Sequence, residues 1–154
     1  MDSLISYSDV TAVTPLTKAD FEALAGFRFG IRKVLRLSEE AARGLGVTPQ
    51  QYQLLLALKG FPDRDWATVG ELADQLQLRH HTVVELINRV QKLGLVQRGR
   101  HPADWRAVRV ELLPAGEQVL ERLDGAHREQ LVHLQQLDDG ARLRVTPRRT
   151  LSKD

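Results

Sequence analysis

Two short amphipathic segments separated by a tight break constrain the fold of this chain more than any other feature. The run Thr68-Val69-Gly70-Glu71 has the form of a capping box, in which a hydroxyl and a carboxylate satisfy backbone N–H groups at a helix start. After a break at 77–79, a second segment runs to Gly94, where Leu95 can pack back on Val90 as in a Schellman stop. Each segment carries one apolar stripe, formed by Leu72, Ala73 and Leu76 in the first and by Val83, Leu86, Ile87 and Val90 in the second. Two short helices joined by a tight turn make a helix-turn-helix.

Residues 95–112 predict a β-hairpin directly after this motif. The stretch 95–98 is short and extended, and 99–104 is rich in turn-forming residues. Apolar residues then alternate with Arg109 and Glu111 at the positions Val108, Val110 and Leu112. A helix-turn-helix followed by a basic hairpin describes a winged helix.

Long helices are expected on both sides of the winged helix. A capping box at 17–20 begins a first helix that extends to Gly44, with apolar residues at helical spacing: Phe21, Leu24, Phe27, Ile31, Val34 and Leu35. A second capping box, formed by Thr48 and Gln51 with Pro49 at the first helical position, predicts a helix to Gly60, after which 61–66 is interpreted as a loop. One last long helix is predicted from Pro114 to about residue 138, with Leu120, Leu123, His127, Leu131 and Leu134 on one side. The expected fold is therefore mainly α.

Composition excludes several classes of protein. A chain of 154 residues fits one domain, and the absence of cysteine excludes disulfides, thiolate catalysis and cysteine-ligated zinc. There is no HExxH motif, Gly-rich phosphate loop or nucleophile motif, so we expect neither an enzyme nor a cofactor. No apolar run approaches the roughly 20 residues that a bilayer requires, and the N-terminus lacks the features of a secretory signal. A cytoplasmic location, with no membrane partner, is expected.

Positive charge is concentrated in one window. Between Arg79 and Arg109 there are seven Lys or Arg residues against only Glu85 and Asp104, a net charge of +5 in a chain whose total is +2. Such asymmetry indicates an anionic partner such as nucleic acid, with a solvated basic face as the alternative.

Two stretches carry a family resemblance. ELADQLQLRHHTVVELINRVQKLGLVQR, at 71–98, and DWRAVRVELLPAG, at 104–116, are similar to patterns of the multiple-antibiotic-resistance regulator (MarR) family of bacterial winged-helix transcription factors. The resemblance spans about residues 20–135. It implies a homodimer, paired through the first and last helices, that binds a pseudo-palindromic operator in double-stranded DNA. Many such regulators repress until a small, often aromatic or anionic, effector binds.

The chain departs from the family pattern at three places. Small hydroxyl residues usually stand where this chain has Arg79-His80-His81, and a threonine N-cap is common where it has Leu113. The last helix of the family looks missing, since Gly140, Pro147 and a charged tail replace the expected apolar period. Dimerisation would then depend more on the N-terminal arm, the first helix and the helix that starts near Ala115.

The resemblance suggests a division of the chain. Residues 1–16 are expected to form an irregular arm, 17–137 a single domain, and 138–154 a flexible basic tail. Within the domain, 17–45 and 114–137 would be dimerisation helices, and 46–113 would be the DNA-binding lobe.

The candidate DNA contacts lie on the second helix of the motif and on the wing. First-turn residues would meet base edges or phosphates, and Arg79 could bind guanine O6 and N7 bidentately. Arginine at the wing suits the narrow minor groove of A·T-rich DNA or the phosphates. The full set is Arg79, His80, His81, Thr82, Val84, Asn88, Arg89, Arg98, Arg100 and Arg106.

Several of these side chains have plainer interpretations. Val84 should be exposed, either to contact a thymine methyl or as a scattered surface residue, and Glu85 can pair with Arg89. Asp104 is expected to orient Arg106, and Trp105 to act as a packing lid for the hairpin.

Histidine chemistry is the main competitor of DNA binding. A metal site at His80-His81 is disfavoured because adjacent helical residues diverge by about 100 degrees. His127 is interpreted as a satisfied interface histidine, with pH or ligand sensing as the alternative. The alternative for the whole chain is a winged-helix effector-binding or protein-interaction module without DNA binding, against which the basic window argues.

Overall fold

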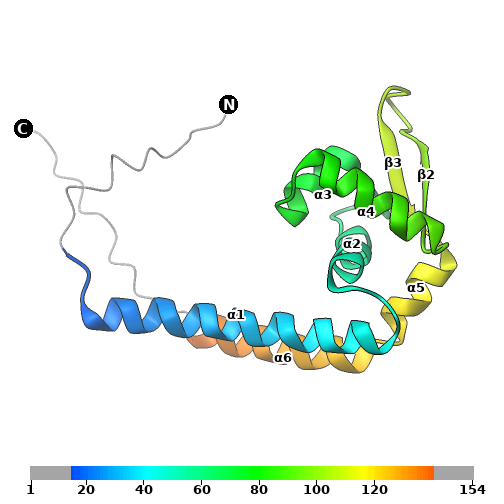
Figure 1. Ribbon diagram of the computed structural model, residues 1–154. Helices are drawn as coiled ribbons and strands as arrows, with labels where there is room; N and C mark the ends of the chain where they lie inside the picture. Colours follow the sequence, from blue (N-terminus) through cyan, green and yellow to red (C-terminus); the bar gives the residue numbers. More distant parts are fainter. Residues whose placement is uncertain (1–14, 141–154) are drawn as a thin grey trace, which may run out of the picture.

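A computed structural model describes residues 15–140, and Figure 1 shows their arrangement. The described part of the chain is mainly helical, with one small antiparallel sheet, so the predicted fold class is confirmed. Two helices form a long arm along one side, and the remaining elements form a lobe above one end of it (Figure 1). The predicted N-terminal arm, apart from residues 15 and 16, and the predicted tail from residue 141 lie outside the described residues.

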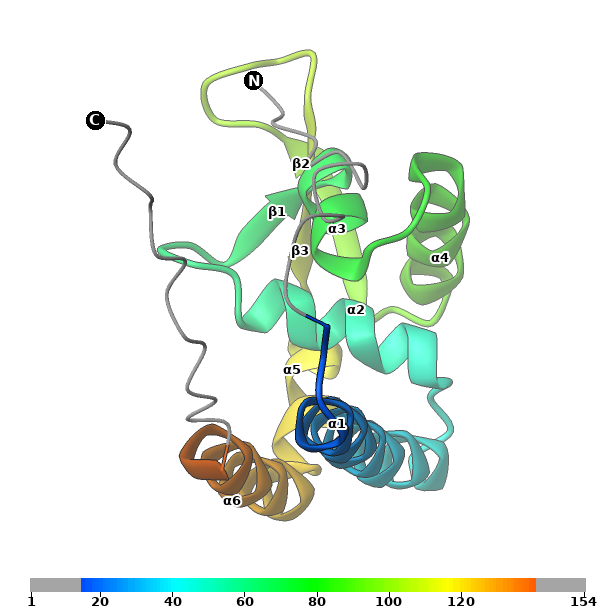
Figure 2. The ribbon, with the colours of Figure 1, turned by 90° about the vertical axis from the view of Figure 1, so that its left-hand side faces the viewer.

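The arm consists of α1 (Lys18–Gly44) and α6 (Asp124–Gly140), which lie side by side in both ribbon views (Figures 1 and 2). The expected capping box begins α1, because Asp20 N donates to Thr17 Oγ1 at 3.2 Å and Thr17 N donates to the Asp20 carboxylate at 2.7 Å. Gly30 allows the two helices to approach closely, since a Cβ there would overlap the Leu137 side chain.

The single C-terminal helix predicted from the sequence is wrong. The chain forms α5 (Pro114–Glu121) and then α6, with a turn at Arg122 and Leu123 between them. Leu123 is buried in the lobe core, whereas Leu131 is 64% exposed on the arm. One straight helix could not place Leu123 in the lobe core and Leu131 on the arm, because α5 packs against the lobe whereas α6 packs against α1.

The lobe contains α2 (Pro49–Lys59), α3 (Val69–Leu76) and α4 (His80–Lys92), together with a sheet in the order β1-β3-β2. Its strands are β1 (Trp66–Thr68), β2 (Val96–Arg100) and β3 (Val108–Leu112), all paired antiparallel. We call β2, β3 and the loop 101–107 the wing. β1 was not predicted, and it pairs Ala67, which is fully buried, with Val110 of β3.

The core of the lobe forms around α2, which lies between the arm and the other lobe elements (Figure 2). The apolar stripes predicted for α3 and α4 point into it, so the helix-turn-helix packs as expected. The largest fully buried side chains are Leu54, Leu55, Leu58, Leu72, Val83, Ile87, Val90, Val96 and Val110.

Local hydrogen bonds fix the ends of the motif. Gln77 adopts the left-handed conformation with φ 52°, which produces the tight turn between α3 and α4. Gly94 has φ +72°, and bonds from Leu95 N to Val90 O (3.2 Å) and from Gly94 N to Gln91 O (2.9 Å) complete the predicted Schellman stop.

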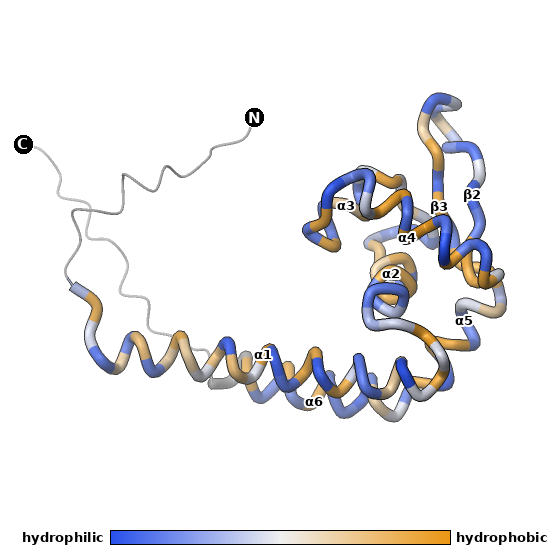
Figure 3. The backbone as a smooth tube through the Cα atoms, in the orientation of Figure 1, coloured by the Kyte–Doolittle hydropathy of each residue, from blue (hydrophilic) through white to orange (hydrophobic). Residues whose placement is uncertain are grey.

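The arm leaves much apolar surface uncovered. Along α1 and α6, hydrophobic and hydrophilic residues alternate in the tube of Figure 3, but few of the hydrophobic ones are buried. We call the exposed set the arm apolar surface; it contains Phe21, Leu24, Phe27, Phe29, Ile31, Leu35, Leu131, Val132 and Leu134. Among the apolar residues predicted for the first helix, only Val34 is buried.

Candidate nucleic-acid interface

The start of α4 and the wing meet around one groove. Its volume is about 500 Å³, and its lining comes from the end of β1, the start of α3, the first turns of α4 and the wing. We call it the basic groove; its lining residues are Thr68, Val69, Gly70, His80, Val84, Arg98, Arg106, Ala107 and Val108. Candidate residues that are up to 26 positions apart in the sequence are therefore neighbours in space.

The first turn of α4 presents its polar side chains outward. Arg79 is the N-cap residue and makes no side-chain capping bond, and Arg79, His80 and His81 are all exposed. Thr82 is half-buried. Val84 is also half-buried, against the expectation that it would be exposed, because it lies in the wall of the basic groove opposite the wing.

Arg98 links the wing to α4. Its guanidinium donates to Gln91 Oε1 at 2.6 Å and to Asn88 Oδ1 at 2.7 Å. These two bonds hold the base of the wing against the middle of the helix, and they use part of the hydrogen-bonding capacity of Asn88 and Arg98. Further along α4, Arg89 pairs with Glu85 at 3.9 Å, as the i,i+4 spacing predicts.

The loop of the wing is ordered by two side-chain acceptors. Asp104 Oδ1 accepts from the backbone N–H of Arg106 at 2.9 Å, so Asp104 orients the backbone of Arg106 rather than its guanidinium. His101 Nδ1 lies 3.0 Å from both Ala103 N and Asp104 N, and its ring packs edge-on against Trp66 with centroids 4.8 Å apart. The loop is thereby attached to β1.

Trp105 does not cover the hairpin. Its side chain is 76% exposed, so its predicted role as a packing lid is wrong. Trp66 packs against the wing loop instead, because β1 adds a third strand that the sequence did not predict. The Arg106 guanidinium lies 5.4 Å from the centroid of the Trp105 ring.

We predict that replacing His101 with alanine frees the wing loop, because the amides of Ala103 and Asp104 lose their acceptor. Their hydrogen exchange should become roughly fivefold faster, as expected for the loss of about 1 kcal/mol of local hydrogen bonding. His101→Asn, whose amide oxygen can replace Nδ1 as an acceptor, should restore most of the protection in the same NMR measurement. Equal exchange rates in all three proteins would contradict this role of His101.

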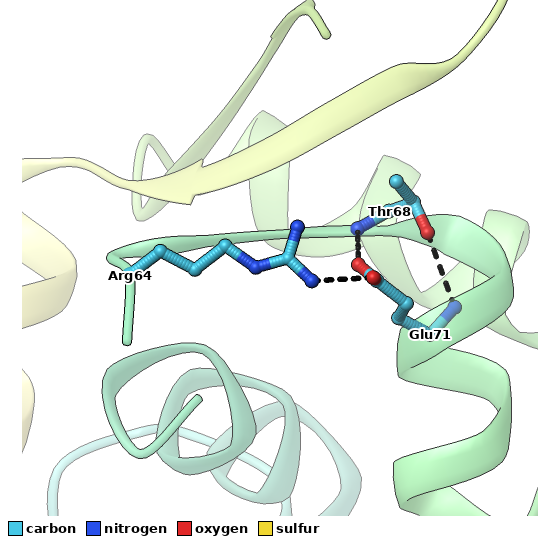
Figure 4. Close-up of polar contacts among 3 residues, drawn as sticks. All are labelled: Arg64, Thr68 and Glu71. Atoms are coloured by element: carbon cyan, nitrogen blue, oxygen red, sulfur yellow. Dashed lines mark hydrogen bonds and ion pairs between the residues drawn. The ribbon is translucent and has the colours of Figure 1, made fainter. Parts of the chain in front are cut away.

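A second cluster anchors the start of α3 (Figure 4), and one of its members, Thr68, lines the basic groove. Glu71 accepts from Thr68 N at 2.8 Å and forms an ion pair with Arg64, while Glu71 N donates to Thr68 Oγ1 at 3.2 Å. The same guanidinium lies over the rings of Phe61 (4.5 Å) and Trp66 (4.1 Å). The capping box was predicted; Arg64 was not, although a basic residue between two aromatic residues offered a weak signal.

The environment of Glu71 has opposing effects on its pKa. Burial raises it, but hydrogen bonds from Thr68 and Arg64 together outweigh burial and hold the pKa of Glu71 below its usual value. A depressed carboxyl pKa contributes stability that is present above the unfolded-state value and is lost as the pH falls through the folded-state value.

We therefore predict that the free energy of unfolding falls as the pH is lowered through the pKa of a free glutamate, about 4.3, and on down through the folded-state pKa. In Glu71→Gln this part of the pH dependence should disappear, as measured by urea unfolding at several pH values. Glu40→Gln is a suitable control, because Glu40 pairs with Arg36 on the exposed side of α1. If the free energy of unfolding of Glu71→Gln depends on pH as it does in the wild type, Glu71 does not stabilise the fold through these contacts.

A polar contact joins the lobe to the arm. His127 Nε2 of α6 lies 2.8 Å from the hydroxyl of Tyr52 in α2, and the two rings stack with centroids 5.8 Å apart. Burial raises the pKa of the Tyr52 phenol. His127 thus has the partner expected of a satisfied interface histidine.

Within residues 15–140, no three His, Asp or Glu side chains are grouped so that they could hold a metal ion. The helices of this part of the chain include none that is both long and apolar enough to cross a membrane.

A helix-turn-helix and a wing, with cations around a groove that they share, define the class of winged-helix DNA-binding regulators. The sequence model of the MarR family matches residues 45–107. Two curated relatives also match. The chain is 32% identical over 120 residues to YsmB, an uncharacterized HTH-type transcriptional regulator of Bacillus subtilis (strain 168), covering 75% of this chain and 80% of that protein. It is 31% identical over 106 residues to a putative transcriptional regulatory protein for the hcr operon of Thauera aromatica, covering 69% of this chain and 59% of that protein.

Solved structures agree in fold. AbsC of Streptomyces coelicolor, a MarR family transcriptional regulator, aligns with a TM-score of 0.65 at 20% identity, over 81% of this chain and 84% of AbsC. A mutant of S. aureus MepR bound to an oligodeoxyribonucleotide aligns with a TM-score of 0.57 at 20% identity, over 79% of this chain and 84% of MepR. The chain belongs to the MarR family of HTH-type transcriptional regulators, as its sequence resemblance indicated.

Proposed function

We propose that this protein is a homodimeric repressor that binds a specific double-stranded operator and is released from it by a small-molecule effector. The observation that carries the DNA-binding part is the convergence of the α4 start and the wing on the basic groove, which His80, Arg98 and Arg106 line and next to which Arg79 caps α4. No carboxylate is among the residues that line this groove, which favours an anionic partner.

In this proposal the first turn of α4 enters the major groove. Arg79 makes no capping bond, so its guanidinium is available to bind guanine O6 and N7. His80, His81 and Thr82 can donate to bases or phosphates from the same turn. Val84 forms part of the apolar wall beside them, where it can contact a thymine methyl.

The wing then follows the DNA backbone or the adjacent minor groove. Arg106 is the best placed cation, since the Asp104 bond fixes its backbone and its side chain lines the basic groove. Arg100, at the tip end of β2, and Arg89, on the exposed side of α4, are proposed phosphate contacts. Asn88 and Arg98 would act as a pair, because they are already bonded to each other.

The arm apolar surface supports the proposed homodimer. Contiguous exposed apolar surface on a monomer commonly marks an interaction site, and a second copy offers a matching surface by two-fold symmetry. We propose that residues 17–45 and 114–137 form the dimer interface and that 46–113 form the DNA-binding lobe. Two lobes would then read two half-sites of a pseudo-palindrome.

Repression and effector release are proposed on family grounds, and the effector would be a small aromatic or anionic molecule. Such a regulator would act in the cytoplasm, where bacterial DNA lies. The competing function is an effector-binding or protein-interaction module without DNA binding. The exposed cations around the basic groove weigh against it, because a protein interface has no need for them at both the helix start and the wing.

The proposal is tested by titrating duplexes from the region upstream of the protein's own gene at two salt concentrations. Wild-type affinity should fall steeply with salt, because phosphate contacts release counterions. Arg106→Ala should weaken binding to all sequences, whereas Arg79→Ala should relax the preference at one base position. Lys59→Ala removes an exposed cation that pairs with Glu117 and lies outside both the basic groove and the proposed dimer interface, so it should have no effect. If the wild type does not bind the duplexes, or binds them with an affinity that does not depend on salt, the proposal is refuted. If Arg106→Ala and Arg79→Ala both bind like the wild type, the roles assigned to Arg106 and Arg79 are refuted.

A further inference from the structure

Trp105 combines high exposure with a fixed position. It is the most exposed of the large apolar side chains in the described part of the chain, at 76%. Its loop is not loose, because Asp104 holds the backbone of Arg106 and His101 holds the amides of Ala103 and Asp104. The ring is therefore kept outward by an ordered loop.

The surroundings of Trp105 are basic. The Arg106 guanidinium lies 5.4 Å from its ring centroid, and Arg100 is exposed near the same end of the hairpin. A single exposed apolar residue is common on protein surfaces and by itself needs no explanation. A rigidly presented indole beside a cation is different, because the pair offers an apolar face and a positive charge at the same place.

Duplex DNA is the partner that fits this combination. The walls of the minor groove consist of deoxyribose C–H groups, and minor-groove proteins frequently use apolar side chains together with arginine there. The negative potential of a narrow groove attracts the guanidinium, and the sugars can cover the indole. An acidic protein surface would attract Arg106 equally, but it has no comparable apolar wall beside its charges.

We propose that Trp105 is a DNA contact, which enters the minor groove together with Arg106 and packs its ring against the sugars. This role deepens the proposed function and rests on it. Trp105 would add affinity that does not depend on salt, because burial of an apolar ring releases no counterions. Arg106 would supply the salt-dependent part.

The first test is tryptophan fluorescence of the wild type and of Trp105→Phe, whose remaining tryptophan is Trp66. With a saturating upstream duplex, wild-type emission should change and acrylamide quenching should fall. Both effects should be lost in Trp105→Phe. If they persist there, they come from Trp66 and the proposal is wrong. If quenching falls on raising the concentration of protein without DNA, Trp105 lies in a protein contact and the proposal is also wrong.

The second test separates the two side chains by affinity. Trp105→Ala should weaken binding about 10- to 100-fold, as expected for burial of a large apolar side chain, with an unchanged slope of log affinity against log salt. Arg106→Ala should reduce the magnitude of that slope by about one. Leu93→Ala removes another exposed apolar side chain, at the far end of α4, and should bind like the wild type.

A folding control and two binding outcomes separate a failure of the role of Trp105 from a failure of the proposed function. Circular dichroism and thermal unfolding should match in all variants, as expected for substitution of exposed side chains. If the wild type binds DNA with a steep salt dependence but Trp105→Ala binds equally well, the role of Trp105 is refuted and the proposed function stands. If the wild type binds no duplex, the proposed function fails, and this inference fails with it.

Discussion

Replacing Leu131 and Leu134 together with glutamate is expected to convert the proposed dimer into a folded monomer and to lower the affinity for a two-site operator at least 100-fold. The two side chains are 64% and 50% exposed on α6, so their replacement removes no contact from the core of the lobe. Four charges in a symmetric interface would repel one another and would lose their hydration. Each monomer would then bind one half-site alone, without the avidity of two linked lobes.

The assembly state is measured by analytical ultracentrifugation, and the affinity by titration with an operator duplex. The double variant Gln135→Glu and Gln136→Glu adds the same two charges at exposed polar positions of the same helix. It should dimerise better than the leucine variant, because it leaves the arm apolar surface intact. A leucine variant that remains dimeric would show that the interface lies elsewhere on the molecule.

Replacing Gly116 with alanine is expected to reduce the free energy of unfolding by about 3 kcal/mol, at the upper end of the usual effect of overpacking. Gly116 is buried at the start of α5, and a Cβ there would overlap the carbonyl oxygen of Leu95 and lie 3.1 Å from Leu112 Cδ2. The carbonyl is backbone and already accepts from Leu113 N at 2.9 Å, so it cannot move aside without breaking this bond.

Urea unfolding measures this effect, with Gly125→Ala as the matched control. A Cβ at Gly125 in α6 would meet no atom within 4 Å, so alanine should change stability by no more than about 1 kcal/mol there, in the stabilising direction. If Gly116→Ala and Gly125→Ala are equally stable, Gly116 does not pack closely against the carbonyl of Leu95, which lies just after α4.

The parts of the fold that could be predicted from the sequence are those encoded by neighbouring residues. The three capping boxes and the stop at Gly94 depend on side chains and dihedral angles within a few positions, and all four are present. The buried stripe of α4 follows from helical periodicity alone. This local information was sufficient to predict the helix-turn-helix and the hairpin.

The parts that were missed depend on distant residues. β1 has only three residues, too few for an alternating pattern, and it forms because Ala67 pairs with Val110. The break between α5 and α6 arises because Leu123 and Leu131 belong to different surfaces. Trp105 remained exposed for a related reason: β1 supplies Trp66 to pack against the loop.

The residues of the candidate site could also be predicted from the sequence only in part. The resemblance and the local charge selected Arg79, His80 and Arg106. The bonds of Arg98 to α4 and of Arg64 to Glu71 bridge residues 7 to 10 positions apart across separate elements, so no periodic pattern predicts them.

Hydroxyl-radical footprinting of the dimer on an upstream duplex tests the central claim most directly. If two symmetry-related lobes place the starts of their α4 helices in successive major grooves, each duplex should show two protected half-sites of similar sequence in inverted orientation. Their centres should be about one helical turn, roughly 10 base pairs, apart. Arg106→Ala should weaken both half-sites equally. A single protected segment, or protection without any inverted repeat, would contradict the account of this protein as a dimeric operator-binding regulator.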